Sequence, residues 1–259
     1  MKRFKLTIAY DGTAYCGWQR QPAPTPTVQR TVEKAVGEIV SHPVTVNGSS
    51  RTDTGVHALG QVAAMNVETD LDTERLRRAI NSRLPNDVLI RKLEEVPSTF
   101  DVRTAIHKRY RYLIWADVDR PVFHRFYAYH FYRPLDIPRM QEACAAFVGT
   151  HDFEAFKGQL DQRDNTVRTI FNCSIHRRGP LVVFAVEGSG FLYHMVRTMA
   201  GTVVQVGLGS DPWTPARIPE ILASKNRKNA GPCLPAVGLH LQWIRFPDLS
   251  NEGTSTSGG

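Results

Sequence analysis

Cysteine is scarce in this chain of 259 residues. The four that occur, Cys16, Cys144, Cys173 and Cys233, form no CxxC pair. Thiols this few and this far apart argue against a disulfide scaffold and a cysteine-based zinc site, and they suit a reducing compartment. The nine histidines contain no HxxxH or HExxH spacing. The sequence therefore predicts no metal site.

Long hydrophobic runs are also missing. No apolar stretch approaches the ~20 residues that a membrane helix requires. The first residues, Met1-Lys2-Arg3-Phe4-Lys5, lack the apolar core of a signal peptide. We therefore expect a soluble, cytoplasmic protein that does not contact a membrane.

Positive charge is in excess. The chain has 32 lysines and arginines against 25 acidic residues, a net charge of +7, and it is 42% hydrophobic. This composition is that of a globular protein with a sizeable core. A basic surface is compatible with a polyanionic partner, although a mild excess alone is weak evidence for one.

Hydrophobic periodicity gives the same order of elements in both halves of the chain. In the first half it predicts strands over residues 4–10, 44–47, 61–67 and 88–93, and helices over 27–40 and 72–84. Thr27 and Asp72 are the expected N-caps of the two helices. The order βαββαβ is that of a ferredoxin-like unit.

The second half repeats this order. The pattern predicts strands over 109–115, 167–175, 181–186 and 239–246, with helices over 136–148 and 191–206. A long insertion, residues 211–236, contains a further helix. The predicted fold class is α+β, with two ferredoxin-like halves, sheets joined side by side, helices packed on the sheet and a central basic cleft. We assign residues 1–104 and 105–248 to the halves and 249–259 to a disordered tail.

A polar loop between two predicted strands holds a lone acid, Asp53, in the segment Ser49–Ala58. Loops on a rigid scaffold often carry chemistry. An aspartate that acts as nucleophile or base must be ionised and held still, and Arg51 or another arginine close in space could do both. A turn in which Asp53 caps its own backbone explains the local sequence equally well.

Asp53-Thr54-Gly55 is also the tripeptide of aspartic proteases. Those enzymes need two such acids sharing a proton, and the chain has no second DTG. A homodimer could supply the second acid, but a nearby arginine would oppose the shared proton. This interpretation ranks low.

Two further segments carry unusual side chains. Strand alternation over residues 107–115 places Tyr110 and Tyr112 on one face and arginines on the other. Such aromatics could stack on an unpaired base, or they could simply be good strand residues. In the apolar segment 191–201, Arg197 requires either a carboxylate partner, for which Asp53 is a candidate, or a path to water.

An aromatic and basic segment, residues 123–133, has two explanations that the sequence does not separate. It could be an RNA surface, or it could be a contact between subunits, where aromatic residues and arginine are also enriched.

Together these segments resemble the bacterial tRNA pseudouridine synthase A family. The matching segments, in family order, are residues 10–13 and 17–21, RTDTGVHA at 51–58, KRYRY at 108–112, GTHDF at 149–153, TVRTI at 166–170, GFLYHMVR at 190–197, and 230–239 in part. They cover nearly all of the chain except the tail. The RTDTGVHA and FLYHMVR segments together are highly specific.

The resemblance implies an isomerase that converts uridine to pseudouridine at positions 38, 39 and 40 of the tRNA anticodon stem-loop, without cofactor or metal. It makes Asp53 the catalytic aspartate and Tyr110 the residue that stacks on the target base. Arg197 would hold Asp53 ionised, and Arg51 would fill the space left by the flipped nucleotide or contact the RNA backbone. It also implies a homodimer, with one tRNA touching both subunits.

Loop segments depart from the family pattern at Ser49-Ser50, at Glu187-Gly188-Ser189-Gly190 and at Gln159-Leu160-Asp161-Gln162. None of them includes Asp53, Tyr110 or Arg197, so they put only loop-level RNA contacts in doubt. The alternative function is a non-catalytic tRNA-binding or RNA-folding protein with the same surface.

Overall fold

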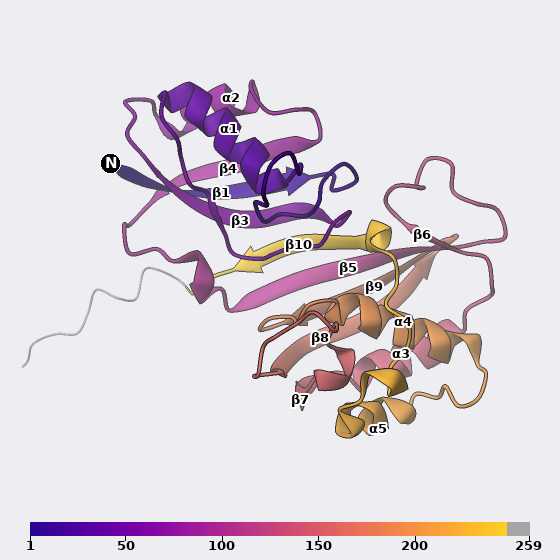
Figure 1. Cartoon of the computed structure of the whole chain (residues 1–259). Coiled ribbons are helices and arrows are strands. Elements are labelled where there is room, and N and C mark those ends of the chain that lie inside the picture. Colours follow the sequence, from indigo (N-terminus) through magenta and orange to yellow (C-terminus); the bar gives the residue numbers. More distant parts are fainter. Residues whose placement is uncertain (248–259) are drawn as a thin grey trace, which may run out of the picture.

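A single twisted β-sheet runs through the protein, with helices packed against it (Figure 1). The computed structural model describes residues 1–247. The predicted tail, residues 249–259, lies outside the described residues. Along the sheet the strand order is β4-β1-β3-β10-β5-β9-β8-β7, with β2 beside β3 and β6 beside β5.

The N-terminal half is the first βαββαβ unit. Its elements are β1 (Lys2–Tyr10), α1 (Val28–Val40), β2 (Asn47–Gly48), β3 (His57–Val67), α2 (Thr73–Asn81) and β4 (Val88–Val96). Every second residue of β1 from Phe4 to Tyr10 is buried, as the alternation predicts. The Asp72 carboxylate caps α2 by accepting the backbone N–H of Arg75 at 2.8 Å.

The C-terminal half repeats the unit with additions. Its elements are η1 (Val102–Thr104), β5 (His107–Ala116), β6 (Tyr129–Phe131), α3 (Ile137–Ala145), β7 (Gly149–Asp152), η2 (Glu154–Phe156), β8 (Val167–Arg178), β9 (Leu181–Gly188), α4 (Met195–Leu208), α5 (Arg217–Ser224), η3 (Arg227–Asn229), η4 (Ala236–Gly238) and β10 (Leu239–Arg245). The strand order β10-β5-β9-β8 matches the order β4-β1-β3-β2 of the first half. The predicted α+β class with two ferredoxin-like halves is therefore confirmed. The boundary after residue 104 stays a prediction.

Strand β10 joins the halves. It pairs parallel with β3, with His240 opposite His57, and antiparallel with β5, with Leu241 opposite Tyr110. This pairing makes the two sheets continuous. It also leaves only β10 between the N-terminal end of β3, where the Asp53 loop ends, and the strand that carries Tyr110.

Several predicted boundaries need correction, and the largest differences are these. The strand predicted over 44–47 is only β2, because the backbone N–H of Val46 donates to the Glu33 carboxylate at 3.1 Å and not to a neighbouring strand. The helix predicted from residue 191 begins at Met195, because His194 before it has a left-handed backbone with φ 62°. The helix predicted over 136–148 ends at Ala145, and the short strands β6 and β7 were not predicted.

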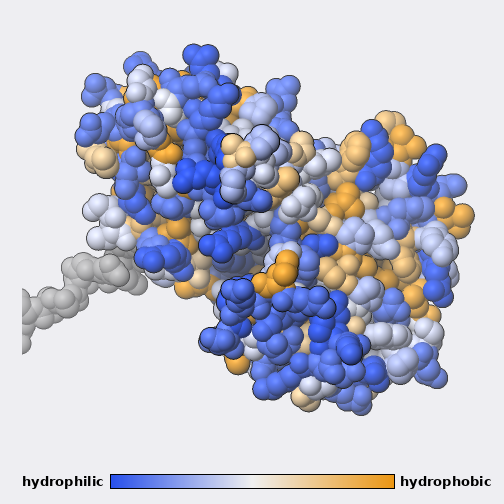
Figure 2. All heavy atoms as spheres, in the orientation of Figure 1, coloured by the Kyte–Doolittle hydropathy of each residue, from blue (hydrophilic) through white to orange (hydrophobic). Residues whose placement is uncertain are grey.

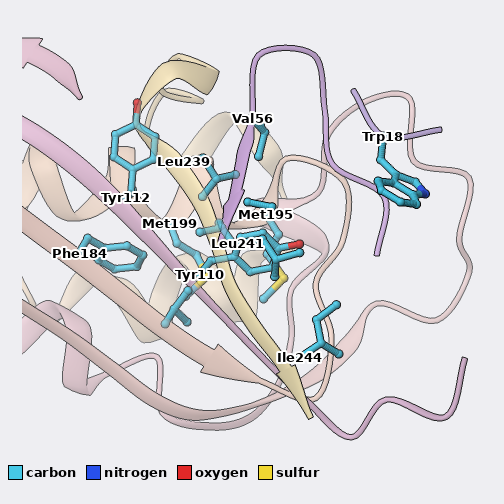
Figure 3. Close-up of a cluster of buried hydrophobic side chains, with 14 of the residues drawn as sticks. Trp18, Val56, Tyr110, Tyr112, Phe184, Met195, Met199, Leu239, Leu241 and Ile244 are labelled. Atoms are coloured by element: carbon cyan, nitrogen blue, oxygen red, sulfur yellow. The ribbon is translucent and has the colours of Figure 1, made fainter. Parts of the chain in front are cut away.

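The core beneath the centre of the sheet is drawn in Figure 3, where Tyr110, Tyr112, Phe184, Met199 and Leu241 gather between the strands and α4. Tyr112 is fully buried, and its hydroxyl donates to the carbonyl of Pro235 at 2.6 Å. Tyr112 is therefore a core residue, whereas Tyr110 lines a cavity. The stacking of Tyr110 on a base stays a prediction.

Candidate active site

The loop that carries Asp53 is held in place from both halves of the protein. The Thr52 hydroxyl lies 2.7 Å from the Tyr10 hydroxyl of β1, and the Ser50 hydroxyl lies 3.0 Å from the Tyr110 hydroxyl of β5. Ser50 and Thr52 are buried, so Asp53 follows two anchored positions. The anchoring by the Ser50 and Thr52 hydroxyls was not predicted from the sequence. The signal available was the pair of small hydroxyl residues just before the acid.

Glycine is required behind this loop. Gly17 has φ 85°, and a Cβ there would lie 2.4 Å from the carbonyl oxygen of Thr52. The backbone N–H of Trp18 donates to the same oxygen at 3.1 Å. A side chain at position 17 would therefore push the segment away from the Asp53 loop.

Arg197 pairs with Asp53, the candidate carboxylate partner that the sequence offered. Its Nη1 lies 3.2 Å from Asp53 Oδ2, and its Nε donates to the carbonyl of Leu234 at 2.6 Å. The two side chains are 14% and 21% exposed. Gly201, one turn further along α4, permits this arrangement, because a Cβ there would lie 1.8 Å from the carbonyl oxygen of Pro232.

Among the described residues, no backbone N–H donates to the Asp53 carboxylate, so Asp53 does not form the turn cap that the local sequence allowed. Its Oδ1 accepts no hydrogen bond from any described residue. One oxygen of the carboxylate is therefore without a partner among residues 1–247, in a residue that lines the cavity. The guanidinium beside it also opposes the shared proton of an aspartic protease.

His194 is the second neighbour of the carboxylate. Its Nε2 lies 3.6 Å from Asp53 Oδ2. Burial, and next the positive charge of Arg197, lower the pKa of His194, against the pull of Asp53. His194 is therefore neutral at pH 7, and Arg197 supplies the positive charge beside Asp53. The helix predicted over 191–206 includes His194, but this residue lies just before α4.

Tyr110 lies on the wall of the same cavity. Its ring meets Phe191 edge-on, with centroids 5.3 Å apart. Burial raises the pKa of Tyr110 to about 12, with a smaller contribution from Asp53, although the Ser50 hydrogen bond acts in the opposite direction. The hydroxyl therefore keeps its proton at neutral pH, and the ring is an uncharged surface.

A cavity of about 910 Å³ brings these residues together with both halves of the chain. Asp53, Tyr110, Arg51 and Arg197 all line it, so the structure gathers the four predicted residues in one place. Arg51 is exposed and makes no hydrogen bond or ion pair to another residue in 1–247. Figure 2 shows hydrophilic side chains on both sides of the recess between the upper and lower parts of the molecule.

The cavity has a second carboxylate, Asp161, from the loop that departs from the family pattern. Asp161 is fully engaged, because it pairs with Arg163 and accepts the backbone N–H of Tyr193 at 2.6 Å. The Arg163 hydrogen bond is the main reason why the pKa of Asp161 lies well below its usual range. Asp53 is therefore the acid in this cavity with an oxygen available for chemistry.

Metal and membrane features were searched for over residues 1–247. That part of the chain contains no group of three or more His, Cys, Asp or Glu side chains suited to a metal ion. None of its helices combines the length and the apolar character needed to cross a membrane.

Sequence comparison finds a matching family model and relatives that are similar over most of this chain. A family model described as tRNA pseudouridine synthase matches residues 6–104 and 143–247. The tRNA pseudouridine synthase A of Caldicellulosiruptor saccharolyticus is 42% identical over 93% of this chain and 98% of its own. The enzyme of the same name from Acetivibrio thermocellus is 43% identical over 95% of this chain and 100% of its own. A solved Cbf5-Nop10-Gar1 complex matches 93% of this chain and 47% of that chain, with 12% identity and a TM-score of 0.38.

Proposed function

The chain belongs to the tRNA pseudouridine synthase family, and from this premise we propose that it isomerises uridine to pseudouridine at positions 38, 39 and 40 of the tRNA anticodon stem-loop. One observation carries the proposal. The Asp53 carboxylate pairs with Arg197 through Oδ2 and keeps Oδ1 without a partner among residues 1–247. Asp53 lines the same cavity as Tyr110 and several cationic side chains. We assign Asp53 the catalytic role, with Tyr110, Arg51 and Arg197 as substrate-binding residues.

The target base must leave the RNA stack to reach Asp53. A base inside a stem is inaccessible, and flipping it out costs a few kcal/mol. Contacts between cationic side chains and phosphates offset this cost. Arg51, which is exposed at the cavity wall and has no partner within residues 1–247, is placed to contact the RNA backbone or to fill the space that the base leaves.

The reaction conserves the atoms of the nucleotide. The bond from uracil N1 to ribose C1′ breaks, the uracil rotates, and a bond from C5 to C1′ forms. C5 then loses its hydrogen as a proton, and N1 carries one. In our proposal Asp53 Oδ1 faces the reacting nucleotide while Arg197 holds the carboxylate in place through Oδ2. The neutral Tyr110 ring stacks on the uracil.

We propose that the protein acts as a homodimer through an exposed apolar patch on residues 117–132. The large hydrophobic side chains of this patch are Val118, Val122, Phe123, Phe126, Tyr127 and Tyr132. Figure 2 shows hydrophobic residues at the right-hand edge, where the loop before β6 lies in Figure 1. Apolar, aromatic surface of this kind is typical of subunit contacts.

Sedimentation measures the oligomeric state. We expect the wild-type protein to sediment at twice the mass of the chain and Phe123→Glu to sediment as a monomer. Phe123 is 87% exposed, so the substitution leaves the core of the monomer intact. A monomeric wild type, or a Phe123→Glu dimer of unchanged affinity, would contradict this surface.

We place this activity in the cytoplasm. The four cysteines are free thiols, which suits a reducing compartment. Cell fractionation tests the location, and recovery of the protein with an envelope fraction would contradict it.

The isomerase activity is tested with a tRNA transcript that carries uridine tritiated at C5. The reaction removes the C5 hydrogen, so we expect tritium to appear in water when uridine is present at position 38, 39 or 40. A transcript with cytidine at these three positions is the matched control. Binding of the tRNA without tritium release would instead favour the non-catalytic alternative.

A further inference from the structure

Lys108 contributes a cation to the cavity wall two residues before Tyr110 on β5. Its Nζ donates to the carbonyl of Ser49 at 2.9 Å, in the loop that leads to Asp53. Ser49, Asp53 and Lys108 line the same cavity. Lys108 belongs to the KRYRY segment, and the sequence alone indicates no role for it.

Three of the four arginines that line the cavity have carboxylate partners. Arg197 pairs with Asp53 and Arg163 pairs with Asp161. Arg103 Nη2 lies 2.6 Å from Asp101 Oδ2. Lys108, by contrast, has no carboxylate within ion-pair distance among residues 1–247. Arg51 shares this lack of a partner, but it is exposed to water.

Lys108 is partly buried, and a partly buried cation without a counter-charge is unfavourable. Burial, with the nearby charge of Arg163 acting in the same direction, lowers the pKa of Lys108 to about 8. A single neutral carbonyl does not compensate the ammonium. An anion that enters the cavity would do so, and the polyanion that this protein is proposed to bind has one phosphate per nucleotide.

We propose that Lys108 binds a backbone phosphate beside the flipped target nucleotide. The inference rests on the proposed function, because RNA is the ligand that brings a phosphate into the cavity. One ammonium then bonds the phosphate while it holds the Ser49 carbonyl. Phosphate binding is thereby linked to the loop that positions Asp53.

Binding of RNA is expected to weaken as the pH rises above about 8. The phosphate stabilises the charged ammonium, so the complex takes up a proton that the free protein has lost at high pH. The charged groups around the cavity are the pairs of Arg103, Arg163 and Arg197 with their acids, together with exposed Arg51. None of these arginines loses its charge near pH 8.

The experiment measures binding of an anticodon stem-loop RNA to proteins that carry Asp53→Asn, so that no turnover occurs. At pH 7 we expect Lys108→Met to weaken binding about tenfold and to lower the salt-dependence slope by about 0.7 to 0.9, the contribution of one phosphate contact. Lys108→Arg should restore the slope and remove the weakening above pH 8. Lys92→Met, an exposed lysine on the edge strand β4, is the matched control and should change neither.

Two outcomes would overturn the inference. One is unchanged affinity and slope in Lys108→Met. The other is weaker binding with an unchanged slope and no rescue by arginine, which would make Lys108 only a support for Ser49. Failure of the proposed function is separate, because it appears as absent tritium release from the wild type. Binding that depends on Lys108 can persist in that case.

Discussion

Asp53→Asn is expected to lower pseudouridine formation by at least ~10³-fold, the scale seen when a central catalytic group is removed. Asparagine has nearly the same shape as aspartate, and its amide oxygen can still accept from Arg197. What disappears is the negative charge and the oxygen Oδ1, which has no partner among residues 1–247. The loop itself is held by Ser50 and Thr52, so it should keep its position.

Single-turnover tritium release is the appropriate measurement, because it isolates the chemical step from product release. Stem-loop binding and Tm should stay close to wild type. Asp70→Asn, at an exposed position away from the cavity, serves as the matched control. Tritium release by Asp53→Asn at the wild-type rate would show that another group performs the chemistry.

The sequence predicted the order βαββαβ in each half because its apolar residues recur with the periods of strands and helices. It also predicted that Arg197 needs either a carboxylate or a path to water, since an arginine in an apolar helix is costly without one of them. That Asp53 is the partner is seen only in the structure, where β10 pairs with both β3 and β5. Strand pairing between halves leaves no signal in local periodicity.

Two element boundaries differ from the prediction because side-chain carboxylates accept backbone N–H groups. Glu33 takes the N–H of Val46, which shortens a strand that the apolar pattern favours. Asp161 takes the N–H of Tyr193, just before the point where α4 begins. Both carboxylates are distant in sequence from the N–H that they accept, so neither boundary could be predicted from local residues. The role proposed for Lys108 likewise depends on which cations have partners.

Replacing Arg197 with methionine should lower the rate of the chemical step by about 10² to 10³-fold, the usual cost of losing one preorganised electrostatic contact in an active site. Methionine retains much of the apolar volume but leaves Asp53 Oδ2 without its cation and the carbonyl of Leu234 without its donor. The substitution also removes one cause of the lowered pKa of His194, so the comparison is made at pH 8, above the ordinary pKa of a histidine. Arg197→Lys should be intermediate, because a single ammonium cannot make both contacts with the geometry of a guanidinium.

Chemical rescue separates this electrostatic role from a purely structural one. Millimolar guanidinium chloride should restore part of the activity of Arg197→Met, whereas sodium chloride at equal ionic strength should not. In the Asp53→Asn background, Arg197→Met should lower the Tm less than it does in the wild type, because no carboxylate is then left without a partner. Equal losses of Tm in both backgrounds, together with no rescue, would mean that Arg197 acts through the Leu234 contact and not through Asp53.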